Sequence, residues 1–448
     1  MKRIPDSWVL STVGKVTLPV SMVEATSSED RQIQYIDIGS IDNQRNRIAE
    51  PKRLSLAAAP SRARQIVKSG DVLFATVRPY LRNIAHVPDS LDGEIASTGF
   101  AVLRPANGIE PKYLFYKAIS QDFVSALTGK QYGVSYPAVK DEQVRAQPIE
   151  LPPTNEQRRI VAKIEELFSE LDKGVESLTT AREQLKAYRQ SVLNSAFSGE
   201  LTGADADGWT EYTVGQLAID IRYGTAKKCA IDPTKTPVLR IPNVASGRID
   251  LVDLKHTDFT ASELDKLRLE QGDILIVRSN GSASLVGLSA IVTDAAAGYA
   301  YAGYLIRLRV KKDVVLPDFL NLYLHSPMVR ASIERQARSS SGVHNVNSDE
   351  IRAIALRVPP IPVQERIVDT VSEMRSQIEA LESSVETELT RSNALRHAIL
   401  QKAFSGQLVP QDASDEPASV LLARIRAAQE EGGTKKRRNG KNSMKEAA

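Results

Sequence analysis

The most regular hydrophobic pattern in the chain lies between Thr154 and Phe197. Apolar side chains recur there at alternating spacings of four and three residues, with breaks at Gly174 and Ala181. They are Ile160, Ile164, Leu167, Leu171, Leu178, Leu185, Tyr188 and Val192. This spacing predicts one long α-helix with a single apolar seam. About 44 residues at ~1.5 Å each give roughly 66 Å, more than one small domain covers, so we expect the helix to project between domains.

The same pattern returns 207 residues later. The sequence Ala-Phe-Ser-Gly begins at Ala196 and again at Ala403, which gives the offset 403 − 196 = 207, and Pro152-Pro153 falls on Pro359-Pro360 without a gap. The second seam has Glu388 and Ser392 as its weak points and consists of Ile367, Val371, Met374, Ile378, Leu381, Val385, Leu395 and Ile399. The sequence therefore predicts two equivalent long helices.

Both helices carry matching boundary signals. Thr154 to Gln157 has the form of a capping box, and the proline pair before each helix keeps the preceding residues extended. Gly199 and Gly406 are suited to the left-handed conformation that ends a helix. We therefore expect both helices to begin and end at equivalent residues.

Weaker repeats extend into the rest of the chain. Gly70-Asp71-Val72-Leu73 matches Gly272-Asp273-Ile274-Leu275, and Trp8 with Thr12-Val13-Gly14 matches Trp209 with Thr213-Val214-Gly215. Three matches in the same order indicate two homologous halves. A single helix of this kind could form a homodimeric coiled coil. Two copies in one chain favour an intramolecular antiparallel pair, with the halves related by a pseudo-two-fold axis.

The regions outside the helices mix short strand-like runs with amphipathic helices, such as Pro111 to Ser120 and Pro317 to His325. The predicted fold class is therefore α+β, with two α/β domains in a pseudo-two-fold arrangement, joined by two long antiparallel coiled-coil helices. We expect an amphipathic helix near residues 418–429 and a disordered basic tail after it. The predicted domains are 1–150 and 201–357, the helices 151–200 and 358–408, and the C-terminal part 409–448.

Composition narrows the class of protein. Lys and Arg number 58 against 55 Asp and Glu, a net charge of +3, so any affinity for nucleic acid must come from local basic patches. The single cysteine, Cys229, excludes an internal disulfide and a cysteine-based zinc cluster. The start MKRIPDSW has no apolar run behind it, and no stretch approaches the ~18 apolar residues of a membrane span. We expect a cytoplasmic protein without membrane contact.

Motifs for catalysis are absent from the sequence. No Asn/Asp-Pro-Pro-aromatic tetrapeptide of an adenine methyltransferase is present, and Thr128-Gly129-Lys130-Gln131 lacks the first glycine and the hydroxyl residue of a phosphate-binding loop. The five histidines show no metal-ligand spacing. We expect no catalytic residue and no metal site. The alternative is a nuclease or methyltransferase whose site none of these motifs marks.

Several segments could contact DNA. The stretch from Arg45 to Lys68 contains seven basic residues and one acidic residue, which suits phosphate contacts or a solvated surface equally. Arg78, Tyr80 and Arg82 follow directly on a predicted strand, where a loop can present guanidinium and aromatic groups to base edges. Arg278, Ser279 and Asn280 occupy the equivalent place in the second half. This agreement reflects either shared structure or shared DNA contact.

Two further loops are rich in hydrogen-bonding side chains and align through Gly133-Val134 and Gly342-Val343. Their candidate DNA-binding residues are Lys130, Gln131, Tyr132, Ser135 and Tyr136 in the first loop, and Arg338, Ser339, Ser340, His344 and Asn345 in the second. The loops differ strongly in content, so they would read different bases. The alternative is a pair of flexible surface loops without a specific role.

The chain resembles the specificity subunit of type I restriction-modification systems. The resemblance is carried by the tandem helix starts -PP-x3-Q-x-R-I-V- at Pro152 and Pro359, the repeated A-F-S-G-[EQ]-L ends, the G-D-[VI]-L strands and the stretch Leu239 to Val244. It covers nearly all of the chain up to about Gln429. Arg240 and Asn243, within that stretch, join the candidate DNA-binding residues.

The resemblance implies a non-catalytic subunit with two target recognition domains, which read the halves of an asymmetric bipartite DNA sequence for adenine methylation and restriction. It implies two modification subunits and two restriction subunits as partners. S-adenosylmethionine, ATP and Mg²⁺ would be bound by those subunits, so no cofactor is expected on this chain. The alternative is a coiled-coil scaffold or adaptor whose globular domains bind protein.

Overall fold

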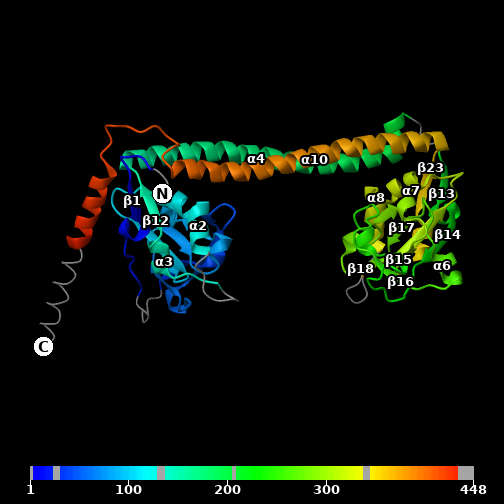
Figure 1. The fold of residues 1–448 in the computed structure, drawn as a ribbon, viewed down its shortest axis with the longest axis horizontal. Helices are drawn as coiled ribbons and strands as arrows, with labels where there is room; N and C mark the ends of the chain where they lie inside the picture. The colour runs from blue at the N-terminus through cyan, green and yellow to red at the C-terminus, as the bar shows by residue number, and fades with distance from the viewer. Residues whose placement is uncertain (1–3, 24–30, 129–136, 204–207, 337–343, 432–448) are drawn as a thin grey trace. The chain divides into compact units, whose positions relative to one another are not determined.

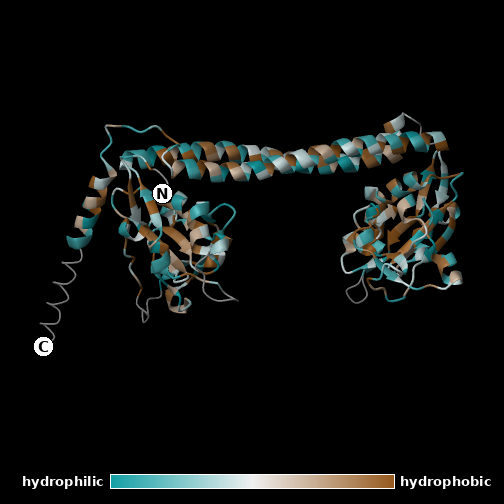
Figure 2. Cartoon of the chain, in the orientation of Figure 1, coloured by the Kyte–Doolittle hydropathy of each residue, from teal (hydrophilic) through white to brown (hydrophobic). Residues whose placement is uncertain are grey.

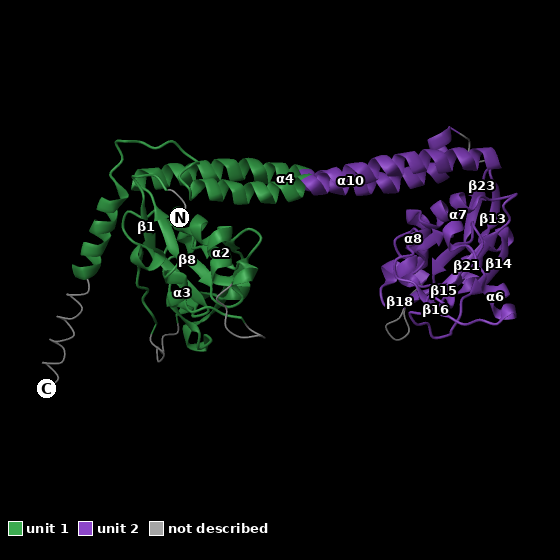
Figure 3. Cartoon of the chain, viewed as in Figure 1, with its two compact units in different colours: residues 1–177, 388–448 green, residues 178–387 purple. Residues whose placement is uncertain are grey.

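The computed structural model describes residues 4–23, 31–128, 137–203, 208–336 and 344–431. The predicted contact residues from Lys130 to Tyr136 and from Arg338 to Ser340 lie outside this part of the chain. The chain divides into two compact units (Figure 3). Unit 1 comprises Met1–Ser177 with Glu388–Ala448, and unit 2 comprises Leu178–Thr387. Each unit therefore contains one globular part and a segment of each long helix.

The globular part of unit 1 is built on a six-stranded and a four-stranded sheet. The six-stranded sheet has the order β2 (Thr17–Leu18), β11 (Phe100–Pro105), β8 (Val72–Ala75), β9 (Ile84–His86), β5 (Arg47–Ile48), β4 (Ile41–Asp42). The four-stranded sheet has the order β6 (Lys52–Ser55), β3 (Gln32–Ile36), β10 (Ile95–Ser97), β7 (Ala63–Ile66). The helices are α1 (Pro111–Ile119), α2 (Gln121–Thr128) and α3 (Asp141–Arg145). The rings of Phe74 on β8 and Phe123 on α2 pack edge to face at 5.7 Å, which places α2 over the larger sheet.

The globular part of unit 2 has related components. A four-stranded sheet has the order β14 (Ala218–Tyr223), β21 (Leu305–Val310), β17 (Ile274–Val277), β19 (Ser289–Ile291). A three-stranded sheet has the order β16 (Lys255–Thr257), β15 (Thr236–Leu239), β20 (Ala300–Tyr301), and β18 (Ser279–Asn280) pairs with β22 (His344–Asn345). The helices are α5 (Val214–Leu217), α6 (Ala261–Leu267), α7 (Pro317–Leu324), α8 (Pro327–Gln336) and α9 (Ser348–Arg352).

In both units the first strand of the globular part pairs with the strand that directly precedes a long helix. In unit 1, β1 (Val9–Thr12) is antiparallel to β12 (Pro148–Leu151), and in unit 2, β13 (Thr210–Thr213) is antiparallel to β23 (Ala355–Val358). The proline pair after β12 and β23 cannot continue either ladder, because proline has no N–H to donate. The chain then enters a helix in both units.

The two long helices are α4 (Thr154–Phe197) and α10 (Ile361–Ala403), shown in Figure 1. In unit 1 the start of α4 lies beside the end of α10, where Asp172 pairs with Arg396. In unit 2 the end of α4 lies beside the start of α10, where Arg189 pairs with Glu382 at 2.9 Å. The helix segments are thus antiparallel within each unit. The predicted fold class, with mixed α/β domains and an intramolecular antiparallel helix pair, is confirmed.

Apolar and polar residues alternate along both helices (Figure 2), but the predicted seams are interrupted. Ile160, Ile164, Ile367 and Val371 are buried, whereas Tyr188, Leu381 and Leu395 are exposed. A straight α-helix drifts by about 20° per heptad relative to a 3.5-residue repeat, so a 4,3 spacing does not keep one face buried over the whole length. The helices pack most closely at their ends, against the globular parts.

The predicted capping box at Thr154 is wrong. The Thr154 hydroxyl donates to the carbonyl of Gly108 at 2.9 Å, and the Gln157 side chain accepts from the N–H of Glu110 at 2.8 Å. Both side chains bind the segment before α1, because that segment brings backbone groups against the helix start. The predicted left-handed glycines are confirmed, with φ of 85° at Gly199 and 73° at Gly406.

The region after α10 packs on the globular part of unit 1 and on the start of α4. Residues 418–431 are helical, as the amphipathic pattern predicts. Ala418, Leu421, Leu422 and Ile425 are buried in the same core as Ile160 of α4. Arg159 pairs with Asp415 at 2.6 Å. The basic run after residue 431, predicted to be disordered, lies outside the described residues.

Candidate nucleic-acid interface

The repeated Gly-Asp pair before β8 and β17 fixes the base of each candidate loop. Asp71 accepts from Arg104 Nε at 3.0 Å and Nη2 at 2.7 Å, and Asp273 accepts from Arg309 Nε and Nη2 at 2.8 Å. Both carboxylates also accept from a backbone N–H three residues earlier, and both are buried. These acids tie a turn to the neighbouring strand.

Arg78 lies just beyond β8 and beside the end of the first candidate loop. Its φ of 49° is left-handed, and its N–H donates to the carbonyl of Pro137 at 2.8 Å. Tyr80, two residues further on, has 47% of its surface exposed. The chain therefore brings the segment after β8 next to the residues that follow the loop 130–136.

Arg82 has a structural role. Its guanidinium donates to Gln121 Oε1 at 2.8 Å and to the carbonyl of Ile119, at the junction of α1 and α2. Half burial of the side chain lowers the pKa of Arg82 from its ordinary value. The predicted DNA contact at Arg82 needs correction, because this side chain is directed into unit 1.

In unit 2 the structure joins two segments that the sequence predicts separately. Ser279 pairs with Asn345 and Asn280 with His344 across the β18–β22 ladder. The carbonyl of Arg278 accepts from the N–H of Val346 at 2.9 Å. The segment after β17 and the end of the second candidate loop therefore form one surface. In Figure 1, β18 lies with β15 and β16 at the end of unit 2 away from its helix segments.

This surface borders a groove of about 670 Å³ that is rich in basic and aromatic side chains. The Arg278 guanidinium stacks over the Tyr223 ring at 4.5 Å, and Tyr304 beside it has 64% of its surface exposed. The basic side chains that line the groove are Lys227, Arg240, Lys255 and Arg278. Guanidinium and ammonium groups next to exposed aromatic rings suit phosphate and base contacts.

Two of these cations have acidic partners. Lys227 pairs with Glu263 at 2.7 Å, and this hydrogen bond is the main cause that lowers the pKa of Glu263 to about 2. Arg240 pairs with Asp253 at 2.7 Å. The partners hold the basic groups in place at the groove and reduce its positive potential.

The predicted DNA contact at Asn243 is also wrong, because this side chain is buried. Only 2% of its surface is exposed. Its Oδ1 accepts from the N–H of Arg240 at 2.9 Å, and its Nδ2 donates to the carbonyl of Asp250 at 2.8 Å. The amide closes the short 3-10 turn Ile241–Asn243 and does not reach the surface.

The basic stretch from Arg45 to Lys68 is partly neutralised. Arg45 and Arg47 pair with Asp42 at 3.3 Å and 3.7 Å, and Lys52 pairs with Asp37 at 2.5 Å. Arg53, Arg62 and Lys68 are exposed. These last three are the side chains of this stretch best placed for phosphate contacts.

Sequence reasoning did not single out Tyr223, Lys227, Lys255 or Tyr304. They come from four different segments, and the two halves of the chain diverge there, so no repeat marks them. One signal was present, because Tyr304 ends the run Tyr-Ala-Tyr-Ala-Gly-Tyr that starts at Tyr299. Alternation in this run leaves Tyr301 buried and the tyrosine after Gly303 exposed.

Other kinds of site find no support in the described ranges. No group of three or more His, Cys, Asp or Glu side chains there could hold a metal ion. Among the helices of these same residues, none has the length and apolar character needed to cross a membrane.

Comparison with known proteins supports a role in DNA recognition. The family described as "Type I restriction modification DNA specificity domain" matches residues 22–180 and again 206–391. The chain is 26% identical to the EcoKI specificity subunit of Escherichia coli K12, over 97% of this chain and 98% of that protein. It is 27% identical to the StySPI specificity subunit of Salmonella potsdam, over 75% of each.

Comparison with solved structures leads to the same family. A chain from a study of assembly and conformational transition of the type I restriction-modification system is 30% identical and has a TM-score of 0.79, over 90% of this chain and 99% of that one. The HsdS subunit of Thermoanaerobacter tengcongensis is 30% identical with a TM-score of 0.61, over 90% and 98%. The chain therefore belongs to the specificity subunits of type I restriction-modification systems, which recognise the DNA sequence and are not the catalysts.

Proposed function

We propose that this chain reads an asymmetric bipartite DNA sequence, with one half-site contacted by each unit. The observation that carries the proposal is the repeated frame: in both units a buried aspartate-arginine pair supports a strand, and an arginine follows that strand beside a candidate loop. The frames are equivalent, but the side chains around them differ. Equivalent frames with different side chains suit two different half-sites.

In unit 2 we assign the contact surface to Arg278, Ser279, Asn280, His344 and Asn345, with Tyr223, Lys227, Lys255 and Tyr304 along the groove. In unit 1 we assign it to Arg78 and Tyr80. The loop candidates from the sequence are Lys130, Gln131, Tyr132, Ser135 and Tyr136. Arg338, Ser339 and Ser340 are retained for unit 2 on the same basis. Arg240 contributes through its place at the groove, whereas Asn243 and Arg82 stabilise the frame.

The partners in this proposal are double-stranded DNA, two modification subunits and two restriction subunits, assembled in the cytoplasm. S-adenosylmethionine, ATP and Mg²⁺ belong to those partner subunits. The modification subunits methylate adenines, which must leave the base stack for the reaction. Recognition by this chain selects the adenines, and methyl transfer takes place in the partner subunits.

Single-molecule methylome sequencing of a strain that expresses the system tests the proposal. We expect one methylated motif with two unlike half-sites and a fixed unread spacer. A continuous or palindromic motif would contradict it. A gel shift with the chain, its modification subunits and excess nonspecific DNA, at stated salt concentration, adds a second test. Binding that does not distinguish the motif from random DNA would favour a scaffold role.

A further inference from the structure

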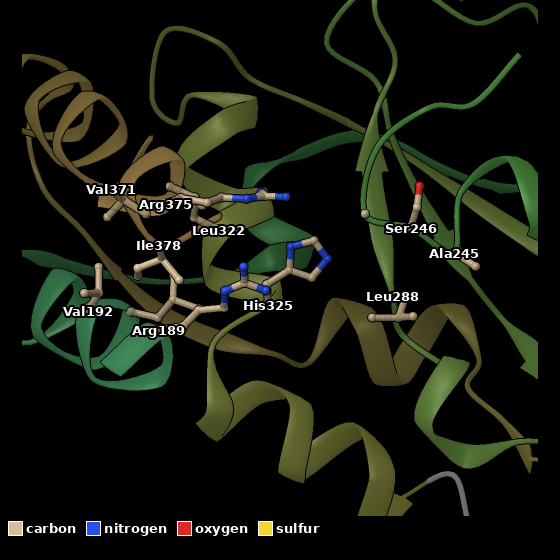
Figure 4. Close-up of a pocket in the computed structure, with 12 residues that line it drawn as sticks. Arg189, Val192, Ala245, Ser246, Leu288, Leu322, His325, Val371, Arg375 and Ile378 are labelled. Atoms are coloured by element: carbon tan, nitrogen blue, oxygen red, sulfur yellow. The ribbon is translucent and has the colours of Figure 1, made fainter. Parts of the chain in front are cut away.

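Unit 2 contains a cavity of about 220 Å³ between its globular part, the end of α4 and the start of α10 (Figure 4). Figure 4 shows the guanidinium groups of Arg189 and Arg375 and the imidazole of His325 directed into the same space. The apolar side chains that line the cavity are Val192, Leu193, Leu288, Leu322, Val371 and Ile378. The cavity is therefore apolar around a cluster of nitrogen donors.

Aromatic side chains pack together at the equivalent place in unit 1. At the offset of 207 between the long helices, Phe168 stands where unit 2 has Arg375. The Phe168 ring packs edge to face on Tyr116 at 5.7 Å, and Arg396 lies over it at 4.9 Å. At the offset of 206 between the helices that begin at Pro111 and Pro317, unit 2 replaces Tyr116 by Leu322 and Ile119 by His325. These three changes turn an aromatic contact into a hollow with polar groups.

The arginines that line the cavity have acidic partners, one of which is shared. In unit 1, Arg396 pairs with Asp172. In unit 2, Arg189 pairs with Glu382 at 2.9 Å, while Glu379 accepts from Arg375 at 2.9 Å and pairs with Arg248 at 3.0 Å. Among the described residues, Glu379 is thus shared by Arg375 and the exposed Arg248, so it compensates the charge of Arg375 only in part.

His325 adds a neutral donor. Burial, followed by the nearby charges of Arg330 and Arg375, lowers the pKa of His325 to about 4. Its Nε2 accepts from the N–H of Ser289 at 3.4 Å, so in the neutral ring the hydrogen is on Nδ1. The imidazole therefore brings no charge of its own at neutral pH.

We propose that this cavity binds a small organic monoanion, with an apolar body against the aliphatic walls and one carboxylate among Arg189, Arg375 and His325. The apolar walls disfavour a bare inorganic ion, and the partly compensated charge of Arg375 disfavours a neutral ligand. A cavity on the order of 150 Å³ accepts benzene, so this one has room for a ring with a carboxylate.

Titration calorimetry of the full-length chain with benzoate, benzamide and inorganic phosphate tests this proposal. We expect benzoate to bind at least about tenfold more tightly than either of the others, the ratio that ~1.4 kcal/mol represents. Benzamide or phosphate binding as tightly as benzoate would overturn the proposal.

Three variants test the location. R375Q should weaken benzoate binding at least about tenfold. R366Q is the matched control, because Arg366 is exposed on the same helix and loses the same charge, so its binding should be unchanged. L322Y introduces the tyrosine of unit 1, fills the cavity without changing a charge, and should abolish binding. Circular dichroism confirms folding of each variant. Benzoate affinity that survives in both R375Q and L322Y would overturn the assignment.

Discussion

Gln157 Oε1 accepts a 2.8 Å hydrogen bond from the backbone N–H of Glu110. This bond joins the start of α4 to the residue before α1. The same contact recurs in unit 2, where Gln364 Oε1 accepts from the N–H of Leu316 at 2.8 Å. Gln157 Nε2 also donates to Pro152, and Gln364 Nε2 donates to Val314 and Pro359. A buried amide thus fixes each long helix to its own globular part.

Replacement of either glutamine by leucine should lower the free energy of unfolding by about 2–4 kcal/mol, because each change leaves at least two buried or half-buried backbone groups without their side-chain partner. Q157L and Q364L should behave alike, since the two amides make equivalent bonds. Urea-induced unfolding followed by circular dichroism measures the effect.

The control for this pair is Q377L, which makes the same change at an exposed position of α10. Its effect should stay within about 0.5 kcal/mol. Equal losses in Q377L and Q364L would show that the buried amides do not carry the effect.

The long helices could be predicted because their signal is periodic and occurs twice. The predicted capping box was wrong because the true partners of its side chains lie far away in the sequence. A local motif relates Thr154 only to Gln157, whereas the partners of these side chains are Gly108 and Glu110, more than 40 residues earlier. Sequence patterns within one turn of a helix do not report contacts made over that distance.

In the candidate site, too, the sequence indicates residue types but not the contacts that the fold creates. Arg278 and Asn345 could be named because their residue types suit DNA, but their pairing across β18 and β22 depends on the fold. Asn243 was named for the same reason and is buried, since polarity alone does not distinguish a surface amide from one that closes a turn. Tyr223 lies at the end of β14, and only the structure brings its ring under Arg278.

R278A should weaken binding to the DNA motif that methylome sequencing identifies by about ten- to hundredfold. An arginine that contacts a base edge contributes about 1–3 kcal/mol of discrimination between bases. The change should relax one half-site and leave the other unchanged, and R78A should relax the opposite half-site. Competition gel shifts with single-base variants of each half-site measure this.

K311A provides the comparison for R278A. Lys311 directly follows β21, whereas Tyr304 directly precedes it, so about 20 Å of strand separates Lys311 from the groove. Binding should be unchanged in K311A. Uniform weakening over all DNA sequences in R278A would assign Arg278 to phosphate contact and not to base recognition.

His325 should make unit 2 less stable in acid. The pKa of His325 in the folded chain is lowered by burial and by Arg330 and Arg375 to about 4, against an ordinary value of 6.5. The unfolded chain therefore binds the proton first as the pH falls, and stability that is fully present above pH 6.5 is lost down to about pH 4. The total is about 3 kcal/mol, from the difference between the two pKa values.

H325Q removes this titration and retains a polar side chain. The difference in unfolding free energy between H325Q and the parent chain should change by about 3 kcal/mol between pH 7.5 and pH 4, in favour of the variant at low pH. Unfolding curves at half-unit pH steps measure it. A constant difference over this range would mean that His325 does not titrate as its surroundings require.

Both long helices have a segment in each unit, and we predict that their length sets the unread spacer between the half-sites. A heptad inserted after Ser177 in α4, with a second after Ser384 in α10, adds about 10.5 Å to each helix at ~1.5 Å per residue. This corresponds to about three base pairs at ~3.4 Å each. Methylome sequencing should show the same half-sites with a spacer longer by about three base pairs. Seven residues inserted into the connection 410–417 should leave the spacer unchanged, because that connection belongs to unit 1 alone. An original spacer in the double-insertion variant would exclude the helices as the element that measures the distance.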